Sequence, residues 1–167
     1  KVYHPDFIAL CEVWKPHTSC VSLEGYQFIS KLRPPNKKGG GVAMYISNKY
    51  DFKINETINN LKLTTIETLA VNITIQNNIL TLISIYRPPG SNQTDTLDDI
   101  EKILSNIENK CIITGDVNID YSNNNCLKTA YDTKLTDWKM FQYVKAYKRL
   151  TSKTNTTIDH VISNMTN

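Results

Sequence analysis

The chain has 167 residues, of which 40% are hydrophobic and 21% are charged. This is the composition of a globular protein, and the length is most simply that of one domain with its own core. The formal net charge of +3 is mildly basic, which fits a polyanionic partner without identifying one. No apolar run approaches the ~20 residues that a membrane-spanning helix needs, so we expect no membrane partner.

The ends of the chain and its cysteines bear on its origin. The sequence begins with Lys1 rather than Met, enters a strand-like run almost at once and shows no signal peptide, so we expect a piece of a longer protein. No pair of cysteines has the C-x-x-C spacing of a zinc site. Free thiols in an intracellular chain are therefore favoured over disulfides in a secreted one. The four cysteines are Cys11, Cys20, Cys111 and Cys126.

The first half of the chain reads as a series of strands. Short apolar runs are bounded by turn residues, and apolar residues alternate with smaller or polar ones over 69–75, the period of a half-buried strand. Asn77-Asn78 reads as a hairpin break before the next run, and Pro88-Pro89 ends that run because proline cannot continue a central strand. The predicted strands are 6–11, 25–29, 42–46, 69–75 and 79–86.

Two helices and two further strands are predicted in the second half. Apolar residues at helical spacing predict a helix over 97–107, with Thr94 or Thr96 as its N-cap. A second amphipathic helix is predicted over 127–141, with three apolar side chains on one side: Tyr131, Leu135 and Trp138. Residues 111–114 and 157–163 read as strands. The order indicates an α+β fold with two sheets packed face to face and helices outside.

The most informative segment is Gly115-Asp116-Val117-Asn118, which follows a buried strand. Alternate residues of an extended chain point the same way, so Asp116 and Asn118 can face one substrate. An ionised aspartate only accepts hydrogen bonds, whereas asparagine both donates and accepts. One side chain can take a proton from water while the other holds the water or a phosphate oxygen, which suits phosphodiester hydrolysis.

Further polar residues stand at the ends of apolar strands. Glu12 closes the first predicted strand and Tyr86 closes the long strand before Arg87. Rigid strands can hold such groups together at a sheet edge. The alternative is that every strand must end in something polar, and it becomes less favoured once Asp116, Asn118 and Asp159 are added to the set.

With these motifs in view, the chain resembles the endonuclease/exonuclease/phosphatase superfamily, and within it the apurinic-endonuclease-like domain of non-LTR (LINE-type) retrotransposons. The resemblance implies a DNase I-like, four-layer α/β-β/α sandwich of two mixed sheets, with residues 1–167 as one domain that lacks its first and last strands. The matching segments run in the family's order and are residues 6–14, 39–46, 86–89, 115–120 and 158–164.

The resemblance also implies roles for single residues. Glu12 would be the ligand of Mg²⁺, or of Mn²⁺, since a hard divalent ion prefers carboxylate oxygen and keeps several waters. Asp116 would activate the attacking water, and Asn118 would orient that water or bind the phosphoryl oxygens. Tyr86 would donate a hydrogen bond to the scissile phosphate, with Arg87 close to the DNA backbone.

Asp159 would orient the catalytic histidine of the family, which comes from a later Ser-Asp-His segment. That segment should follow Asn167, and an opening strand with a metal-site asparagine should precede Lys1. His160 is not a substitute because adjacent strand residues face opposite ways, so we expect it to be a packing residue. The chain alone is therefore expected to be weakly active or inactive, with an unpaired sheet edge and marginal stability.

A basic loop precedes the glycine triplet at 39–41. Arg33, Lys37 and Lys38 are predicted to contact DNA phosphates beside the cleft, which adds affinity without base specificity. The alternative is a solvated surface loop whose glycines give a tight entry into the next strand.

Taken together, the resemblance implies a metal-dependent endonuclease that nicks target DNA to prime reverse transcription. Its partners would be DNA and a reverse transcriptase domain in the same polypeptide. Its place of action would be the nucleus, with a cytoplasmic pool. Two alternatives stay open: a phosphatase or RNA exonuclease of the same superfamily, and a degenerate remnant that binds nucleic acid or protein without catalysis.

Overall fold

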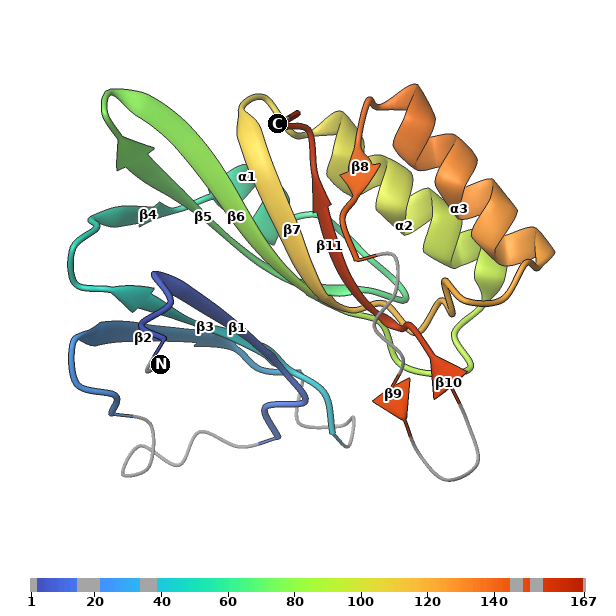
Figure 1. The fold of residues 1–167 in the computed structure, drawn as a ribbon, viewed down its shortest axis with the longest axis horizontal. Helices are drawn as coiled ribbons and strands as arrows, with labels where there is room; N and C mark the ends of the chain where they lie inside the picture. Colours follow the sequence, from blue (N-terminus) through green and yellow to red (C-terminus); the bar gives the residue numbers. More distant parts are fainter. Residues whose placement is uncertain (1–2, 15–21, 34–38, 145–148, 151–154, 167) are drawn as a thin grey trace.

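Two β-sheets pack face to face in the computed structural model (Figure 1). The structure describes residues 3–14, 22–33, 39–144, 149–150 and 155–166. The smaller sheet has the strand order β1-β3-β2 and is antiparallel throughout. Its strands are β1 (Phe7–Cys11), β2 (Tyr26–Lys31) and β3 (Val42–Ser47). β1 lies at the edge of this sheet, with β3 as its neighbour.

The larger sheet has six strands in the order β4-β5-β6-β7-β11-β8. β6 and β7 are parallel and the other pairs are antiparallel, so this sheet is mixed, as expected. A two-stranded pair, β9 (Arg149–Leu150) with β10 (Asn155–Thr156), lies beside it. The six strands are β4 (Phe52–Ile54), β5 (Glu67–Ile75), β6 (Asn78–Tyr86), β7 (Lys110–Asp116), β8 (Phe141–Gln142) and β11 (Asp159–Ser163).

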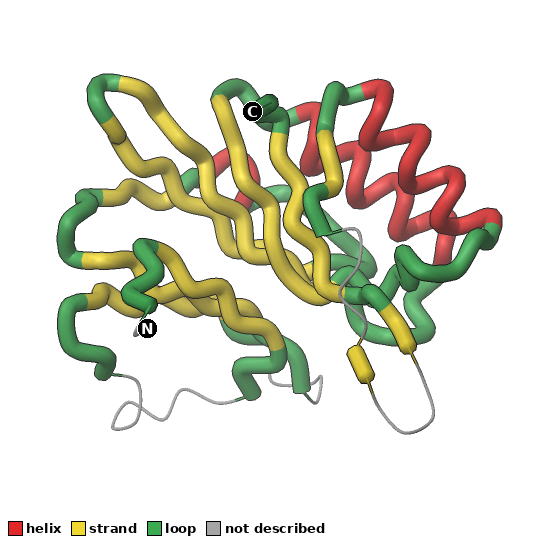
Figure 2. Tube along the Cα trace, viewed as in Figure 1, coloured by secondary structure: helices red, strands yellow, loops and turns green. Residues whose placement is uncertain are grey.

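The helices cover the face of the larger sheet that points away from the smaller one (Figure 2). They are α1 (Glu56–Asn59), α2 (Gln93–Ser105) and α3 (Cys126–Asp137). The expected α+β sandwich of two packed sheets is confirmed. Within the described residues only this sheet carries helices, so three of the four expected layers are present. None of the described helices is long and apolar enough to cross a membrane.

Two separate apolar cores hold the three layers together. Val42, Met44 and Ile46 of β3 meet residues of β5 and β6 between the sheets. On the other side of the larger sheet, Ile103 of α2 and Tyr131 of α3 pack against its central strands. Each fully buried side chain of this size contributes about 1.5–3 kcal/mol. The larger sheet is therefore covered on both faces, and its central strands form the rigid frame of the molecule.

Helix α2 begins one turn earlier than its apolar pattern predicts, and its cap is not a threonine. The side chain of Asn92 accepts a hydrogen bond from the Asp95 N–H at 3.1 Å. Thr96, a predicted cap, is buried inside the first turn, where its hydroxyl donates to the Asn92 carbonyl at 2.6 Å. The prediction missed Asn92 because it stands in a loop of polar residues that all cap well.

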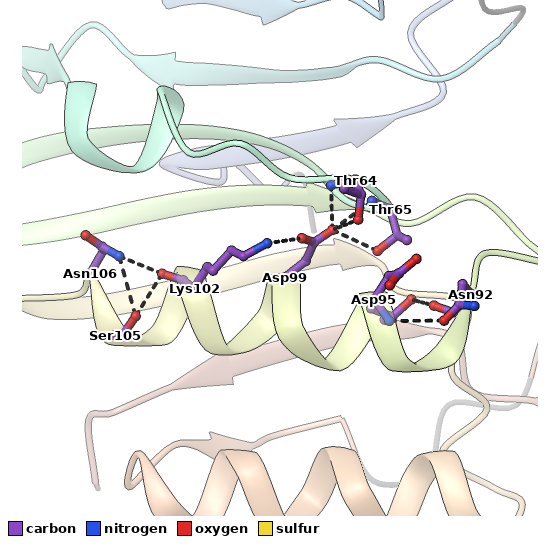
Figure 3. Close-up of polar contacts among 9 residues, drawn as sticks. Thr64, Thr65, Asn92, Asp95, Asp99, Lys102, Ser105 and Asn106 are labelled. Atoms are coloured by element: carbon purple, nitrogen blue, oxygen red, sulfur yellow. Dashed lines mark hydrogen bonds and ion pairs between the residues drawn. The ribbon is translucent and has the colours of Figure 1, made fainter.

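A buried carboxylate fastens α2 to the loop before β5 (Figure 3). Asp99 is fully buried, and its Oδ2 accepts from the backbone N–H groups of Thr64 and Thr65 at 2.8 and 2.7 Å, and from both threonine hydroxyls. Burial alone raises the pKa of Asp99, but these donors and Lys102 outweigh it and the pKa is lowered. The charged form of Asp99 therefore stabilises the fold.

Helix α3 differs from its prediction at its C-terminal end. Tyr131 and Leu135 are buried as the pattern predicts, but the helix ends at Asp137 and Trp138 is its C-cap. The Trp138 side chain is 38% exposed and its indole N–H donates to Glu101 at 2.9 Å. The rim position suits an amphipathic ring whose N–H needs a partner.

Candidate functional site

Three of the predicted site residues stand in one row across the larger sheet. Tyr86 is the register partner of Asp116 in the parallel pair β6–β7, and Asp116 is the partner of Asp159 in the antiparallel pair β7–β11. Register partners on neighbouring strands point to the same face. The row lies where β6 and β7 end and β11 begins, at the lower end of the sheet in Figure 1. Sheet pairing therefore brings together residues that are up to 73 positions apart in sequence, from 86 to 159.

Gly115 allows the row to close tightly. It has φ +150°, and a Cβ built on it would lie 1.9 Å from the Ile85 carbonyl oxygen on β6. No side chain fits at that distance, so only glycine lets β7 approach β6 here. The glycine of the Gly-Asp-x-Asn motif thus serves the backbone, one residue before the Asp116 carboxylate.

Asn118 adopts a left-handed backbone conformation, with φ +50°. Its N–H donates to Asp116 Oδ1 at 3.0 Å, and its side-chain Nδ2 donates to the Arg87 carbonyl at 2.7 Å. The turn therefore orients the Asp116 carboxylate and the Asn118 carboxamide together. Because the acceptor is a carbonyl, the nitrogen of Asn118 must face it, which leaves the carboxamide oxygen on the other side.

Arg87 is not placed as predicted. It is 4% exposed, so it does not offer its guanidinium to DNA at the surface. Its N–H groups instead donate to Thr96 Oγ1 at 2.9 Å and to the carbonyls of Asn118 and Ser91 at 3.0 and 2.9 Å. The prediction that Arg87 lies close to the DNA backbone is therefore corrected. In this fold its side chain turns inward, behind the Asp116–Asn118 turn.

Glu12 follows β1 in the smaller sheet and faces the row from across the gap between the sheets. Its backbone has φ +60°, a conformation that is uncommon and strained for a glutamate. Its Oε2 accepts from the Gly40 N–H at 3.0 Å and from the Trp14 indole N–H at 2.5 Å, and its Oε1 accepts from the Tyr86 hydroxyl. The bond from Tyr86 is the main cause that lowers the pKa of Glu12, so this exposed carboxylate is ionised at neutral pH.

Tyr86 connects the two sheets. Its ring is buried in the core between them, while its hydroxyl reaches Glu12. Burial and the Glu12 carboxylate raise the pKa of Tyr86, so the phenol keeps its proton and is a hydrogen-bond donor. Cys11 makes a second link, since its thiol donates to the Ile85 carbonyl at 3.2 Å and accepts from the Asp116 N–H at 3.4 Å.

Glu67 is a site residue that the sequence did not reveal. It is the register partner of Tyr86 on β5, so it extends the row by one strand. Its Oε1 forms an ion pair with Arg33 and its Oε2 accepts from the Gly41 N–H at 2.6 Å. The Arg33 guanidinium also lies 5.7 Å from the centre of the Tyr86 ring.

This ion pair changes the picture of the basic loop. Arg33 is largely buried beside the row rather than extended into solvent, its side chain being 14% exposed. Lys37 and Lys38 lie outside the described residues, so their predicted DNA contacts stay predictions. Arg33 thus belongs to the wall of the site, where its charge also lowers the pKa of Glu12.

Asp159 and His160 lie on opposite faces of β11, as the alternation of strand residues requires. Asp159 is exposed and lines, with Asp116 and Cys11, a cleft of about 460 Å³. His160 is 1% exposed, and its Nε2 donates to the Ile119 carbonyl at 2.9 Å while its Nδ1 lies 3.1 Å from the Tyr131 hydroxyl. Burial lowers the pKa of His160, so it is a neutral packing residue, as expected.

The donor set fits a loosely held divalent ion better than a closed metal cage. Among the described residues, no three His, Cys, Asp or Glu side chains come together as ligands. Glu12 offers one ionised carboxylate, which can accept about four hydrogen bonds or ligand contacts and has three donors here. Mg²⁺ commonly binds through one or two carboxylates and keeps waters, so Glu12 fits this ion.

Carboxylates, a phenol donor and a carboxamide gathered at the mouth of a two-sheet sandwich define a protein suited to phosphate esters. The chain belongs to the Endonuclease/Exonuclease/phosphatase family, whose model matches residues 1–164. The members of this family are hydrolases of phosphate esters. A comparison with curated protein sequences finds no match.

Solved structures share the fold at low sequence identity. The endonuclease domain of TRAS1, a telomere-specific non-LTR retrotransposon, is 12% identical with a TM-score of 0.67, over 84% of this chain and 68% of that one. TDP2 of D. rerio complexed with a single-strand DNA product is 12% identical with a TM-score of 0.59, over 95% and 70%. A Cimex nitrophorin in its ferrous NO complex is 14% identical with a TM-score of 0.53, over 96% and 76%. These likenesses show the fold alone.

Proposed function

We propose that this chain is most of a Mg²⁺-dependent DNA endonuclease domain that nicks target DNA for reverse transcription in a LINE-type retrotransposon. The observation that carries the proposal is the row of Tyr86, Asp116 and Asp159 with Glu12 opposite. Four separate sequence segments contribute to the site, and each contributes a group that phosphodiester hydrolysis can use. The two structural neighbours that are a retrotransposon endonuclease and a DNA-bound enzyme support the choice of DNA.

We assign Asp116 the role of general base, which takes a proton from the attacking water. Its carboxylate is half-buried at the cleft, and the Asn118 N–H orients it by donating to Oδ1 at 3.0 Å, so it can act as the base towards a water in the cleft. The carboxamide oxygen of Asn118 points away from Arg87 and can accept the second hydrogen of that water. The remaining Nδ2 hydrogen of Asn118 can donate to a phosphoryl oxygen.

Tyr86 is assigned a hydrogen bond to the scissile phosphate. Its raised pKa keeps the hydroxyl protonated, and a phosphate oxygen can replace Glu12 as its acceptor when substrate enters. A bound Mg²⁺ on Glu12 would stabilise charge on the phosphate and the leaving oxygen. Asp159 would orient an imidazole supplied by sequence beyond residues 1–167, since His160 faces the other way.

The wider setting is part of the same proposal. Residues 1–167 form one domain, which a reverse transcriptase domain follows in the same polypeptide, and nicking takes place in the nucleus. Arg33 sits beside the row, and Lys37 and Lys38 would contact DNA phosphates. These statements depend on the family resemblance and on the TRAS1 neighbour.

The test is a plasmid-nicking assay on the chain with its native flanking sequence, in Mg²⁺ and after chelation. We expect Asp116→Asn to lose about 10²–10⁴-fold in rate, the usual contribution of an acid–base group, and Glu12→Gln to need a higher Mg²⁺ concentration for nicking because it removes the carboxylate ligand. Asp51→Asn, an exposed carboxylate next to β4, is the matched control and should nick like the unchanged chain. If Asp116→Asn nicks as fast as Asp51→Asn, Asp116 is not the base and the proposal fails.

One observation supports a second candidate function, which is binding without catalysis. The Cimex nitrophorin has the same fold and was solved as a ferrous NO complex, so this fold also occurs in a protein that binds a ligand. A third candidate is a phosphatase or RNA exonuclease of the same family. Supercoiled plasmid, an inositol phosphate and labelled RNA offered in parallel separate the three, because the nuclease proposal predicts turnover of plasmid only.

A further inference from the structure

The buried guanidinium of Arg87 donates hydrogen bonds from all three nitrogens to oxygen atoms on two sides. Nε donates to the hydroxyl of Thr96 in the first turn of α2, and Nη2 donates to the Ser91 carbonyl. Nη1 donates to the Asn118 carbonyl at 3.0 Å and approaches the Val117 carbonyl at 3.4 Å. One side chain therefore ties the start of α2 to the turn that carries the site.

The backbone of Arg87 grips the same turn a second time. Its N–H donates to the Asp116 carbonyl at 2.9 Å, and its carbonyl accepts from Asn118 Nδ2 at 2.7 Å. The turn is thus bound to Arg87 at Asp116, Val117 and Asn118. Since Asn118 is left-handed, the turn has a strained backbone that must be held by its surroundings.

We propose that Arg87 is a positioning residue, which acts through Asn118 rather than through DNA. This inference rests on the proposed function and adds a role that the nuclease residues themselves do not have. The guanidinium fixes carbonyls of the Asp116–Asn118 turn. This turn then orients the carboxamide of Asn118 and one oxygen of Asp116 towards the cleft.

The chemistry of arginine suits this position and that of lysine does not. A guanidinium has five N–H donors in a rigid plane, so it can serve acceptors on both sides at once. A lysine ammonium is a compact charge that cannot reach Thr96, Ser91 and Asn118 together. The hydrogen-bond partners of Arg87 are carbonyls and a hydroxyl, which are neutral. Burial lowers the pKa of Arg87, and the nearby negative charge of Asp116 acts in the opposite direction.

The first test reads the orientation of Asn118 and needs no activity. In ¹⁵N spectra of the chain with its native flanking sequence, Arg87→Met should shift or broaden the Nδ2 signals of Asn118. Asn55, whose Nδ2 donates to Asn72 at 3.1 Å far from the site, is the internal control and should not change. Unchanged Asn118 signals in a folded Arg87→Met protein would overturn the inference.

The second test separates positioning from DNA contact by kinetics. Positioning predicts that Arg87→Met lowers kcat about 10–10²-fold, as small misplacements do, with KM within about threefold. Arg87→Lys should fall between Met and the unchanged chain. A DNA contact would instead raise KM and reduce the salt slope of binding by about one. Lys53→Met, which removes an exposed cation from β4, is the matched control and should change neither.

A double-mutant cycle tests the route through Asn118. If Arg87 acts through Asn118, then Arg87→Met added to Asn118→Ala should lower kcat by no more than about threefold further. Full additivity of the two losses would overturn the route. If Arg87→Met fails to fold, Thr96→Val keeps Arg87 and removes the acceptor of Nε together with the Thr96 hydrogen bond to the Asn92 carbonyl, and it should give a smaller loss in kcat and the same shift of the Asn118 signals.

The two tests also separate this inference from the proposed function. If the unchanged chain with its native flanks does not nick DNA, the proposed function fails, and the Asn118 signals still decide whether Arg87 positions the turn. If it nicks DNA and the Asn118 signals do not depend on Arg87, the nuclease proposal stands and the positioning role is wrong.

Discussion

The two sides of the candidate site are held in different ways. Tyr86, Asp116 and Asp159 end or begin strands of a sheet that is covered on both faces, and their spacing is set by strand register. Glu12 instead follows an edge strand of the smaller sheet, is exposed, and is held by hydrogen bonds from Gly40, Trp14 and Tyr86. The side that we propose moves protons is fixed by the backbone ladder, whereas Glu12, the proposed metal ligand, is held by two side-chain donors and one backbone N–H.

The difference has a physical logic. A general base works only within hydrogen-bond reach of its water, so it gains from a rigid frame. A Mg²⁺ ligand must exchange waters and substrate oxygens as the reaction proceeds, so some freedom is useful. We expect substitutions that disturb the backbone or the packing of the sheet side to affect folding and catalysis together, while those that change only a functional group on either side affect catalysis alone.

The largest effect is expected for Gly115→Ala. The new Cβ would lie 1.9 Å from the Ile85 carbonyl, so β6 and β7 must separate at the row, at a cost of roughly 3 kcal/mol or more in unfolding free energy. Gly25→Ala is the control, since it also has positive φ but nothing within 4 Å of its Cβ. Urea unfolding should place Gly115→Ala well below Gly25→Ala; equal midpoints would mean that the row tolerates more than its geometry suggests.

Asp99→Asn tests the frame that supports the sheet side. Replacing a buried carboxylate that accepts five hydrogen bonds by an amide should lower the unfolding free energy by roughly 2 kcal/mol. Because the pKa of Asp99 is lowered in the fold, its contribution is present above the unfolded pKa of about 3.9 and is lost as pH falls through the folded value.

The measurement is urea unfolding of the unchanged chain and of Asp99→Asn between pH 7 and pH 2. The unchanged chain should lose stability in acid more steeply than Asp99→Asn, so the two curves converge at low pH. Asp98→Asn, an exposed neighbour on the same helix, is the control and should follow the unchanged chain. Parallel curves for Asp99→Asn would show that this carboxylate does not set the acid limit.

Tyr86→Phe should reduce nicking about 10–10²-fold, because it removes one donor to the phosphate. It also removes the main cause of the lowered pKa of Glu12, so the acid limb of the pH–rate profile should move to higher pH. Stability should change little, since the ring keeps its place between the sheets. An acid limb that does not move would show that Tyr86 does not set the pKa of Glu12. Tyr45→Phe, on β3 away from the row, is the control.

The smallest effect is expected for Trp14→Phe. It removes one N–H donor to Glu12, the weakest of the three hydrogen-bond causes that lower its pKa. We expect a two- to fivefold rise in the Mg²⁺ concentration that gives half-maximal nicking, roughly 1 kcal/mol or less. The fluorescence of Trp138→Phe, in which Trp14 is the sole tryptophan, should change on adding Mg²⁺. No change in either readout would place the ion away from Glu12.

Most strands of the two sheets could be predicted from the sequence, and the position of one turn explains why Glu67 was missed. The strand runs and the motif residues Tyr86, Asp116 and Asp159 stand out because apolar segments end at them. Glu67 does not, because it precedes its strand's apolar alternation. The residues of the β5–β6 turn are Gln76 and Asn77, both with positive φ, whereas the hairpin break was predicted at Asn77-Asn78. That difference of one residue moves the β5–β6 register by two, which would pair Leu69 rather than Glu67 with Tyr86.

The burial of Arg87 could not be predicted for a different reason. Beside two prolines at the end of a strand, an arginine is usually exposed. Its inward turn depends on acceptors from three segments, including the Asn118 and Ser91 carbonyls, which meet only in the folded chain. The short elements β4 and α1 were missed because three or four residues carry too little pattern to be recognised.

The left-handed backbones of Glu12 and Asn118 have a consequence for how the protein would respond to directed evolution. Glycine at either position would relieve strain of roughly 1 kcal/mol or more, and would remove the functional group with it. A library sorted for heat resistance alone should therefore accumulate glycine at these positions, while one sorted for nicking should reject it. Sequencing both pools would show that selection for stability and selection for nicking favour different residues at these two positions.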